Sequence, residues 1–413
     1  MKNLKGSLIF GQSGGPTAVI NASAYGVFSQ AFMQDNIIKV YGACHGIVGI
    51  LNENFVDMSE EDPSELNLLL NTPSSALGSV RYKLADVEKD ESDYLKLLEV
   101  FKKYDVRYFM YNGGNDSMDT CNKISKYLAS KDYACNVIGV PKTIDNDLFG
   151  TDHCPGYGSA AKYIATTCME LALDSKVYDK GQIIVIEIMG RNAGWLTAAS
   201  AIASYKGLGP DLIYVPEVNF NIDKFLDDVE RVWNEKGNVI AAVSEGIHDE
   251  NGKLIAEYGK SVEKDSFNHV QLGGVGVFLS GLIKTHMSKV KVRPIEFSLM
   301  QRCAAHVGSQ TDIDEAYEAG QRAVEIAVNG GTDVMVGFKR SNKSGKYVCE
   351  MIEVPLSTVA NTEKKLPKEY ILNNSFISKK FMDYVMPLIQ GEVKMRYEDG
   401  VPRFAQFKGK CNH

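Results

Sequence analysis

Apolar and polar residues alternate along this chain with two different periods, and the pattern predicts its elements. Short apolar runs predict strands, and apolar residues that recur every three to four positions predict amphipathic helices. The predicted strands cover residues 7–10, 106–111, 136–140, 182–188, 212–215, 239–243 and about 290–299. The predicted helices cover about 19–33, 91–104, an alanine-rich stretch to about 203, 222–234, and 314–328 with Asp314 as an acidic cap. This alternation predicts parallel, right-handed βαβ units in two similar α/β domains.

The last part of the chain has a different pattern. Residues Val334–Phe338 and Tyr347–Val354 predict a hairpin joined through Lys343-Ser344-Gly345, and a helix is predicted near 377–388. No low-complexity linker separates the regions, so we expect the chain to pass back and forth between the domains. We expect one domain over 1–150, joined by part of 300–413, a second over 151–300, and a C-terminal extension, 331–413, that packs on both.

Composition narrows the class of protein. The 413 residues are 44% hydrophobic and 23% charged, as in a globular protein, and the formal net charge of -7 argues against a nucleic-acid or anionic-membrane partner. The eight cysteines show neither a C-x-x-C pair nor a regular spacing, so we expect reduced thiols in a cytoplasmic protein. The seven histidines lack the spacing of a structural zinc site. The basic start, residues 1–5, leads straight into a strand, so neither a signal peptide nor a membrane span is expected.

The segment Val140-Pro141-Lys142-Thr143-Ile144-Asp145-Asn146-Asp147 carries the densest chemistry. It follows a predicted buried strand, which Pro141 ends because proline has no N–H for a sheet ladder. A lysine there neutralises phosphate oxygens, one aspartate accepts a hydroxyl proton, and the other holds or orients a metal ion. This combination suits phosphoryl transfer. The alternative is an ordinary polar turn between a strand and a helix.

Glycine-rich turns follow two other predicted strands, at Gly11–Thr17 and Asn112–Ser117. A strand, a glycine turn and a helix direct backbone N–H groups toward an anion. Neither turn has the lysine motif of nucleoside-triphosphate loops or the G-x-G-x-x-G dinucleotide motif. Ligands of open α/β sheets bind outside such strand ends, so we expect the turns and the 140–147 loop to meet there. A glycine-rich segment, 272–276, precedes the strand predicted at 290–299.

Taken together, these loops resemble the phosphofructokinase family over roughly residues 7–330. The resemblance implies an active site in the cleft between two domains. The domain over 1–150 would hold the phosphoryl donor and Mg²⁺, and the domain over 151–300 would hold fructose 6-phosphate. It further implies a reversible, glycolytic transfer of phosphate to the sugar C1 hydroxyl by a homodimer or homotetramer.

The resemblance also implies residue roles. Asp145 matches the catalytic base. Lys142, Asp116, Arg81 and Arg191 match other groups around the transferred phosphoryl. The substrate positions are Thr143, Ile144, Met189, Gly190, Glu245, Arg293, Leu299 and Arg302, the two arginines acting partly across a subunit boundary. Gly15, Gly114 and Lys142 match pyrophosphate contacts, and Asn115 and Asp147 match metal-site positions.

Two residues concern the phosphoryl donor. Pyrophosphate-using members of the family carry an acid and a lysine where this chain has Asp116 and Lys142. A carboxylate at Asp116 would meet the α-phosphate of ATP, and two unit charges about 4 Å apart at an effective dielectric near 20 repel by about 4 kcal/mol. The resemblance therefore favours a pyrophosphate-dependent 6-phosphofructokinase, with an ATP-dependent enzyme as the alternative.

Four positions depart from the family pattern. Asn115 replaces a metal-binding aspartate, Leu299 replaces a histidine or tyrosine, Gln182 replaces a substrate arginine, and Tyr25 replaces an effector-site arginine. A non-catalytic regulatory subunit is disfavoured because Asp145, Arg191 and Arg302 are all present. A dinucleotide-dependent oxidoreductase is disfavoured because its glycine motif is missing.

Overall fold

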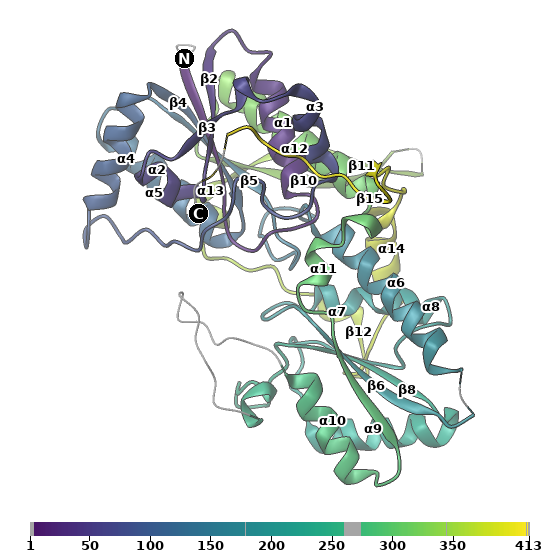
Figure 1. Ribbon diagram of the computed structural model, residues 1–413. Coiled ribbons are helices and arrows are strands. Elements are labelled where there is room, and N and C mark those ends of the chain that lie inside the picture. The colour runs from purple at the N-terminus through teal and green to yellow at the C-terminus, as the bar shows by residue number, and fades with distance from the viewer. Residues whose placement is uncertain (1–3, 178, 260–273, 344, 410, 412–413) are drawn as a thin grey trace. The chain divides into compact units, whose positions relative to one another are not determined.

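The computed structural model describes the chain except for residues 1–3, 178, 260–273, 344, 410 and 412–413 (Figure 1). The first residues of the basic start, part of the glycine-rich segment 272–276 and Ser344 of the predicted hairpin turn therefore lie outside the described residues. Contacts divide the chain into two compact units. The first contains Met1–Ser159, Arg302–Glu363 and Gly391–His413, and the second contains Ala160–Gln301 and Lys364–Gln390.

The first unit is built on a seven-stranded sheet in the order β11-β10-β5-β4-β1-β2-β3. Its strands are β1 (Gly6–Gln12), β2 (Ile37–Ala43), β3 (Phe55–Asp57), β4 (Val106–Gly113), β5 (Asn136–Pro141), β10 (Val334–Lys343) and β11 (Lys346–Pro355). The five central strands are parallel, and β3 and β11 add antiparallel edges. The predicted hairpin is confirmed as β10 and β11.

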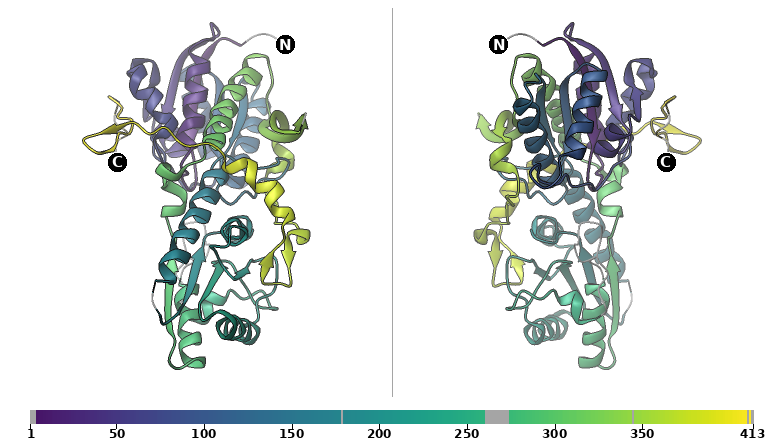
Figure 2. Two further views of the ribbon diagram at one scale, coloured as in Figure 1. Left: turned by 90° about the vertical axis from the view of Figure 1, so that its right-hand side faces the viewer. Right: turned by 90° about the vertical axis from the view of Figure 1, so that its left-hand side faces the viewer.

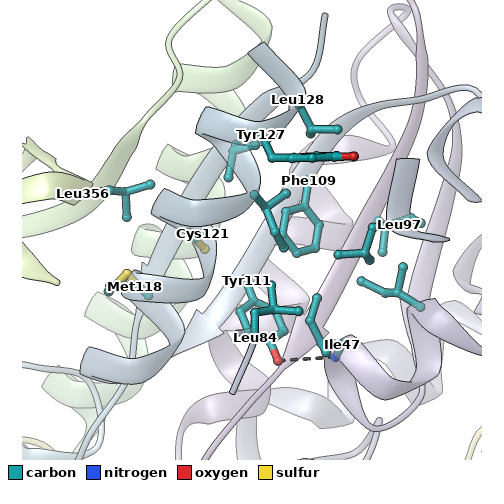
Figure 3. Close-up of a cluster of buried hydrophobic side chains, with 14 of the residues drawn as sticks. Ile47, Leu84, Leu97, Phe109, Tyr111, Met118, Cys121, Tyr127, Leu128 and Leu356 are labelled. Carbon is teal, nitrogen blue, oxygen red and sulfur yellow. Dashed lines mark hydrogen bonds between the residues drawn. The ribbon is translucent and has the colours of Figure 1, made fainter. Parts of the chain in front are cut away.

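Helices cover both faces of this sheet, because successive strand residues point to opposite sides. Leu8, Phe10 and Met110 pack with α1 (Ile20–Ala31), α3 (Pro63–Leu68) and α12 (Gln310–Val328). Ile9, Phe109 and Tyr111 pack on the opposite face with α2 (Gly46–Leu51), α4 (Ser92–Lys103), α5 (Asn115–Ser130) and α13 (Leu356–Val359). Figure 3 shows this second cluster, in which the Tyr111 hydroxyl accepts a hydrogen bond from the Ile47 N–H at 3.3 Å.

Two glycines let α1 and α12 approach closely, side by side in Figures 1 and 2. A Cβ atom on Gly26 would lie 2.0 Å from the Tyr317 carbonyl oxygen, and one on Gly320 would lie 2.1 Å from the Ser23 carbonyl oxygen. These distances exclude any side chain. The first helix of the chain thus packs against a helix that follows the whole first segment of the second unit.

The second unit has a four-stranded parallel sheet in the order β7-β8-β6-β9. Its strands are β6 (Gln182–Ile188), β7 (Leu212–Tyr214), β8 (Val239–Ser244) and β9 (Lys291–Glu296). Helices α9 (Ile222–Lys236) and α10 (Val275–His286) cover one face. Helices α7 (Trp195–Ala199), α8 (Ala201–Tyr205) and α14 (Lys380–Val385) also belong to this unit, with a small ladder of β12 (Ile371–Leu372) and β13 (Phe376–Ile377).

The remaining elements are short or cross the unit boundaries. Helix α6 (Tyr157–Ser175) and helix α11 (Met300–Cys303) each begin in one unit and end in the other. The 3-10 helices are η1 (Met58–Glu60), η2 (Leu69–Asn71), η3 (Ile255–Tyr258), η4 (Ala305–Val307), η5 (Lys368–Tyr370) and η6 (Met386–Ile389), and β14 (Tyr397–Glu398) pairs with β15 (Val401–Pro402). None of the helices in the described residues is long and apolar enough to cross a membrane.

Several predicted boundaries were wrong. The helix predicted from Asp314 begins at Gln310, because the Ser309 side chain caps it by accepting the Asp312 N–H. The strand predicted over 290–299 ends at Glu296, and the alanine-rich helix is divided at Ser200. Helix α1 is shorter than predicted at both ends. Helix α10, which follows the glycine-rich segment, was not predicted at all.

The prediction of reduced cysteines is wrong for two of the eight. Cys44, after β2, forms a disulfide with Cys411, and their Cα atoms are 5.2 Å apart. The C-terminal segment reaches this position because Glu61 accepts hydrogen bonds from the Lys408 and Gly409 N–H groups, at 2.7 and 2.8 Å. The other six cysteines, all within the described residues, form no disulfide.

Candidate active site

The three predicted loops of the first unit meet at one edge of its sheet. Gln12 at the end of β1 pairs with Asn112 of β4, and Gly113 of β4 pairs with Pro141 at the end of β5. The carboxyl ends of these parallel strands are therefore level, and the loops that follow them lie next to one another. Lys142 begins the third loop, and its N–H donates to the Gly113 carbonyl at 3.0 Å.

The glycine turn after β1 holds the segment that carries Arg81. Gly14 has a φ of +76°, a left-handed conformation that glycine adopts without steric cost. The Ser79 hydroxyl donates to the Gly14 carbonyl at 2.6 Å, and the Gly14 N–H donates to the Val80 carbonyl at 3.2 Å. These two bonds fix the backbone immediately before Arg81 beside the turn.

Lys142 is a buried cation. Its side chain is 3% exposed, and Nζ donates to the Gly15 carbonyl at 2.7 Å. Burial lowers the pKa of Lys142 to about 8, with a smaller lowering from Arg302 and Arg81, although Asp145 and Asp147 act in the opposite direction. Lys142 therefore keeps its charge at neutral pH and loses it as the pH rises through about 8.

Two arginines surround the same position. A Cβ atom on Gly15 would lie 3.2 Å from Nη1 of Arg302, so this guanidinium lies against the glycine turn. Burial and the positive charge of Arg81 lower the pKa of Arg302. Positive charges this close destabilise one another, so a bound anion would stabilise all three side chains. This cluster of Lys142, Arg81 and Arg302 is the strongest anion-binding feature of the first unit, although Arg302 was predicted as a sugar-phosphate contact.

The loop from Lys142 to Asp147 is held by its own polar groups. Thr143 Oγ1 accepts the Asp145 N–H at 3.1 Å, and Thr143 forms a bridge with Gly156. Asn146 has a φ of +56° and is fully buried, with Oδ1 accepting the Cys154 N–H at 3.0 Å. Asparagine tolerates this left-handed conformation better than most residues. Asn146 thus positions Asp145 and Asp147 on either side of it, a role that the sequence analysis missed.

Asn115 and Asp147 form an arrangement that fits a hard cation. Asn115 Nδ2 donates to Asp147 Oδ2 at 3.3 Å, whereas Asn115 Oδ1 is buried and has no hydrogen-bond partner among the described residues. Burial and the charges of Asp145 and then Glu363 raise the pKa of Asp147 to about 7. An unpaired amide oxygen beside closely spaced carboxylates is the donor set that Mg²⁺ prefers. Glu363 was not predicted, since it lies far along the chain without a motif.

Asp116 and Gly114 lie beside this arrangement at the start of α5. Gly114 is the N-cap of the helix, and Asp116 is an exposed acid in its first turn. A Cβ atom on Gly114 would meet only the Lys142 carbonyl oxygen, at 3.6 Å. The turn after β4 therefore places Asp116 next to the lysine-bearing loop, at the strand ends where these loops were expected to meet.

In the second unit the loops after β6 and β8 are joined by hydrogen bonds. Gly190, with a φ of +128°, donates its N–H to Glu245 Oε1 at 3.2 Å. The Ser244 hydroxyl donates to the Gly190 carbonyl at 2.5 Å. The Met189 N–H donates to Gln301 Oε1 at 3.3 Å. These contacts bring together Met189, Gly190 and Glu245, three of the substrate positions that the family resemblance implies.

The charge environment of Glu245 is acidic. Burial, together with the carboxylates of Glu187 and Glu296, raises the pKa of Glu245 to about 7, against the lowering effects of the Gly190 N–H and Arg191. Glu187 itself accepts hydrogen bonds from the N–H groups of Gly274 and Gly276 at the start of α10. Glu245 thus lies near a second carboxylate, Glu187, whose oxygens already accept backbone hydrogen bonds.

The other substrate positions are more scattered. Arg293 lies on the edge strand β9 in register with Ile184, and its Nε donates to Gln182 Oε1 at 3.1 Å, so it is near the start of β6 rather than its end. Leu299 follows β9 and is 54% exposed. Thr143 and Ile144, in contrast, are buried in the loop of the first unit. The structure thus brings together most of the predicted positions within each unit, but not Arg293 with Glu245.

The chain is similar to known proteins over nearly its whole length. A family model described as Phosphofructokinase matches residues 7–295. The chain is 42% identical over 402 residues to a pyrophosphate–fructose 6-phosphate 1-phosphotransferase of Halomonas elongata, covering 96% of this chain and 95% of the relative. It is 42% identical over 411 residues to the protein of that name from Xanthomonas campestris, covering 98% and 96%. A crystal structure of a pyrophosphate-dependent phosphofructokinase from Marinobacter aquaeolei matches with a TM-score of 0.87 at 39% identity, over 98% of this chain and 97% of that one.

Proposed function

The chain belongs to the phosphofructokinase family, and we propose that the groups around Lys142 and Asp145 carry out the reaction for which its relatives are named. It is a phosphotransferase that moves a phosphoryl group from pyrophosphate to the C1 hydroxyl of fructose 6-phosphate. The observation that carries the residue assignment is the cluster of Lys142, Arg81 and Arg302 beside two loop carboxylates.

Phosphoryl transfer is catalysed mainly by positioning and by charge. Lys142, Arg81 and Arg302 would hold pyrophosphate and neutralise the charge that develops on its leaving phosphate, together with the N–H groups of Gly15 and Gly114. Asp145 would accept the proton of the attacking hydroxyl, held in place by Thr143 and Asn146. In the reverse direction the same carboxyl returns the proton.

A magnesium ion fits the observed oxygen donors. Asn115 and Asp147 would hold it, since the amide oxygen of Asn115 is buried without a partner among the described residues. When bound, such an ion neutralises phosphate oxygens and orients them for in-line transfer. Asn115 is neutral, so most of the ligand charge on the protein side comes from Asp147.

The groups of the second unit would bind the sugar. Met189, Gly190 and Arg191 form one loop, and Glu245 would accept hydrogen bonds from sugar hydroxyls. We propose that Arg293 contacts the sugar phosphate across a subunit boundary in a homodimer or homotetramer, whereas Arg302 serves the pyrophosphate cluster of its own unit. The exposed position of Arg293 on the edge strand β9 fits this role. We further propose a cytoplasmic location.

The donor is tested by initial rates with fructose 6-phosphate, Mg²⁺ and either pyrophosphate or ATP. We expect turnover with pyrophosphate and almost none with ATP, because Asp116 repels the additional phosphate of a nucleotide by about 4 kcal/mol at close range. The double variant Asp116→Gly with Lys142→Gly is expected to lose pyrophosphate turnover and to gain use of ATP. Efficient ATP turnover by the wild type would refute the donor assignment while leaving Asp145 as the base.

Glu245 gives a pH-dependent prediction. Its pKa is raised to about 7, so the group loses its negative charge as the pH falls through 7. We expect KM for fructose 6-phosphate to rise below pH 7, because a protonated carboxyl accepts fewer hydrogen bonds from sugar hydroxyls. Glu245→Gln is expected to raise KM about 10-fold, as for loss of one charged hydrogen bond, and to remove this pH dependence. A KM profile that is the same in the variant and the wild type would exclude this role.

A further inference from the structure

A buried group of unlike ligands lies in the first unit, apart from the groups assigned to catalysis. His153 from the loop before α6, Glu315 from α12 and Cys349 from β11 place one nitrogen, one oxygen and one sulfur within 4.8 Å of one another. His153 is 2% exposed and Glu315 is 6% exposed. No sequence motif marks this group, because its members come from three distant segments.

Something positive must lie between His153 and Glu315. Nε2 of His153 is 2.7 Å from Oε2 of Glu315, and both atoms offer lone pairs unless the nitrogen carries a proton. The other ring nitrogen, Nδ1, is 2.9 Å from Asp152 Oδ1, and Arg340 in turn pairs with that carboxylate at 3.0 Å. Nδ1 therefore donates its proton to the Asp152 carboxylate in a hydrogen bond. The positive group between Nε2 and Glu315 is then either a second proton or a metal ion.

Three features favour a metal ion over a proton. A carboxylate on the second nitrogen is the usual outer partner of a metal-binding histidine. The Cys349 thiol interacts with Glu315 and with the Tyr347 hydroxyl, so a sulfur ligand lies beside the nitrogen and the oxygen. A proton on His153 alone does not require this sulfur. The Tyr347 oxygen, 3.4 Å from Nε2 and 2.6 Å from Glu315 Oε1, supplies a nearby fourth position.

We propose that His153, Glu315 and Cys349 form a structural site for a zinc-type divalent cation, with the Tyr347 hydroxyl oxygen as the fourth ligand. Nitrogen, sulfur and oxygen ligands in a closed four-coordinate site select Zn²⁺, whereas Mg²⁺ requires oxygen ligands. Binding displaces the proton between Nε2 and Glu315 and the thiol proton of Cys349, and both leave to solvent. Without the metal ion, burial and Glu315 raise the pKa of Cys349, which keeps its thiol protonated.

The site would join three parts of the first unit. His153 lies in a loop that is pinned to β10 by the bond from the Phe338 N–H to Thr151 Oγ1, at 2.8 Å. Glu315 comes from the helix that packs on α1, and Cys349 comes from the edge strand β11. Bound metal would therefore stabilise the unit as a whole, without a part in the chemistry at Lys142.

The test uses the full chain, treated with a chelator and then titrated with Co²⁺ in excess Mg²⁺. Cobalt in such a site gives a thiolate charge-transfer band in the near ultraviolet and visible bands of tetrahedral Co²⁺. We expect one equivalent to produce these bands, Zn²⁺ to abolish them, and Zn²⁺ to raise the unfolding midpoint by several degrees. A wild-type chain that gives no charge-transfer band overturns the proposal.

Matched cysteine variants assign the sulfur. Cys349→Ser changes one atom, and it is expected to lose the charge-transfer band while keeping activity without zinc. Cys121→Ser removes another buried free thiol, in α5, and is expected to keep the band. Persistence of the full band in Cys349→Ser, or its loss in Cys121→Ser, overturns the assignment. Because the spectrum does not depend on turnover, failure of the proposed function would leave this result unaffected.

Discussion

Replacing Asp145 by asparagine is expected to lower kcat by about 10²–10⁴-fold, with little change in KM for fructose 6-phosphate. The amide keeps the size of the side chain, and the backbone bond from the Asp145 N–H to Thr143 does not depend on the substituted atoms. The loss is therefore that of a proton acceptor, and it corresponds to about 3–5 kcal/mol of transition-state stabilisation. Initial rates in both directions measure it, since one carboxyl serves as base and as acid.

Asp105→Asn is the matched control for this experiment. Asp105 is an exposed acid that pairs with Arg107 just before β4, so it lies at the edge of the same sheet opposite to the catalytic loops. The control is expected to keep wild-type kcat. A kcat for Asp145→Asn within tenfold of the wild type, with a folded protein, would show that another group accepts the proton.

Replacing Lys142 by methionine is expected to move activity and stability in opposite directions. We expect kcat/KM for pyrophosphate to fall by about 10²–10³-fold, because a positioned charge at the developing phosphate is lost. Stability is expected to stay the same or to rise, since methionine fills a similar volume and removes a buried cation that Arg81 and Arg302 disfavour. Rates and a denaturant unfolding curve test the two parts, and Lys126→Met, on the exposed side of α5, is the control.

The lowered pKa of Lys142 predicts that activity falls at alkaline pH. The pKa of this lysine is lowered to about 8, so the free enzyme loses this charge as the pH rises through 8, and kcat/KM for pyrophosphate is expected to fall there. In the folded state the neutral form is favoured, so this ionisation adds stability as the pH rises from 8 toward the unfolded value of about 10.4. Bound pyrophosphate restores the proton, so kcat itself should fall only at higher pH. An unchanged alkaline limb in Lys142→Met would assign it to another group.

The local pattern of apolar and polar residues was sufficient to predict much of the fold. The strand predicted at 182–188 is β6 with the same bounds, because both of its faces are buried and residues 183–186 form an unbroken apolar run. Helix α9 was predicted because its buried residues Phe225, Val229 and Val232 recur at helical spacing. Helix α10 was missed because its apolar residues do not form one stripe, and the glycines before it suggested a loop.

Residues of the candidate sites could be predicted only where they lie close together in the sequence. Lys142, Asp145 and Asp147 lie within one loop, and the strand order brings Gly15 and Asn115 beside it. Glu363, Asn146 and the Cys44–Cys411 disulfide depend on tertiary contacts, and the two cysteines are 367 residues apart. No spacing rule connects such residues before the fold is known.

The close contact of α1 with α12 has a consequence for synthesis of the chain. Gly26 and Gly320 meet backbone to backbone, yet the ribosome makes α12 only after the first segment of the second unit. At about 5–20 residues per second, α1 emerges some tens of seconds before its partner helix. For that time the part of the apolar face of β1, β4 and α1 that α12 covers in the folded chain stays exposed. The nascent polypeptide therefore exposes an aggregation-prone surface during translation, and its folding yield depends on elongation rate and on chaperones that bind this surface.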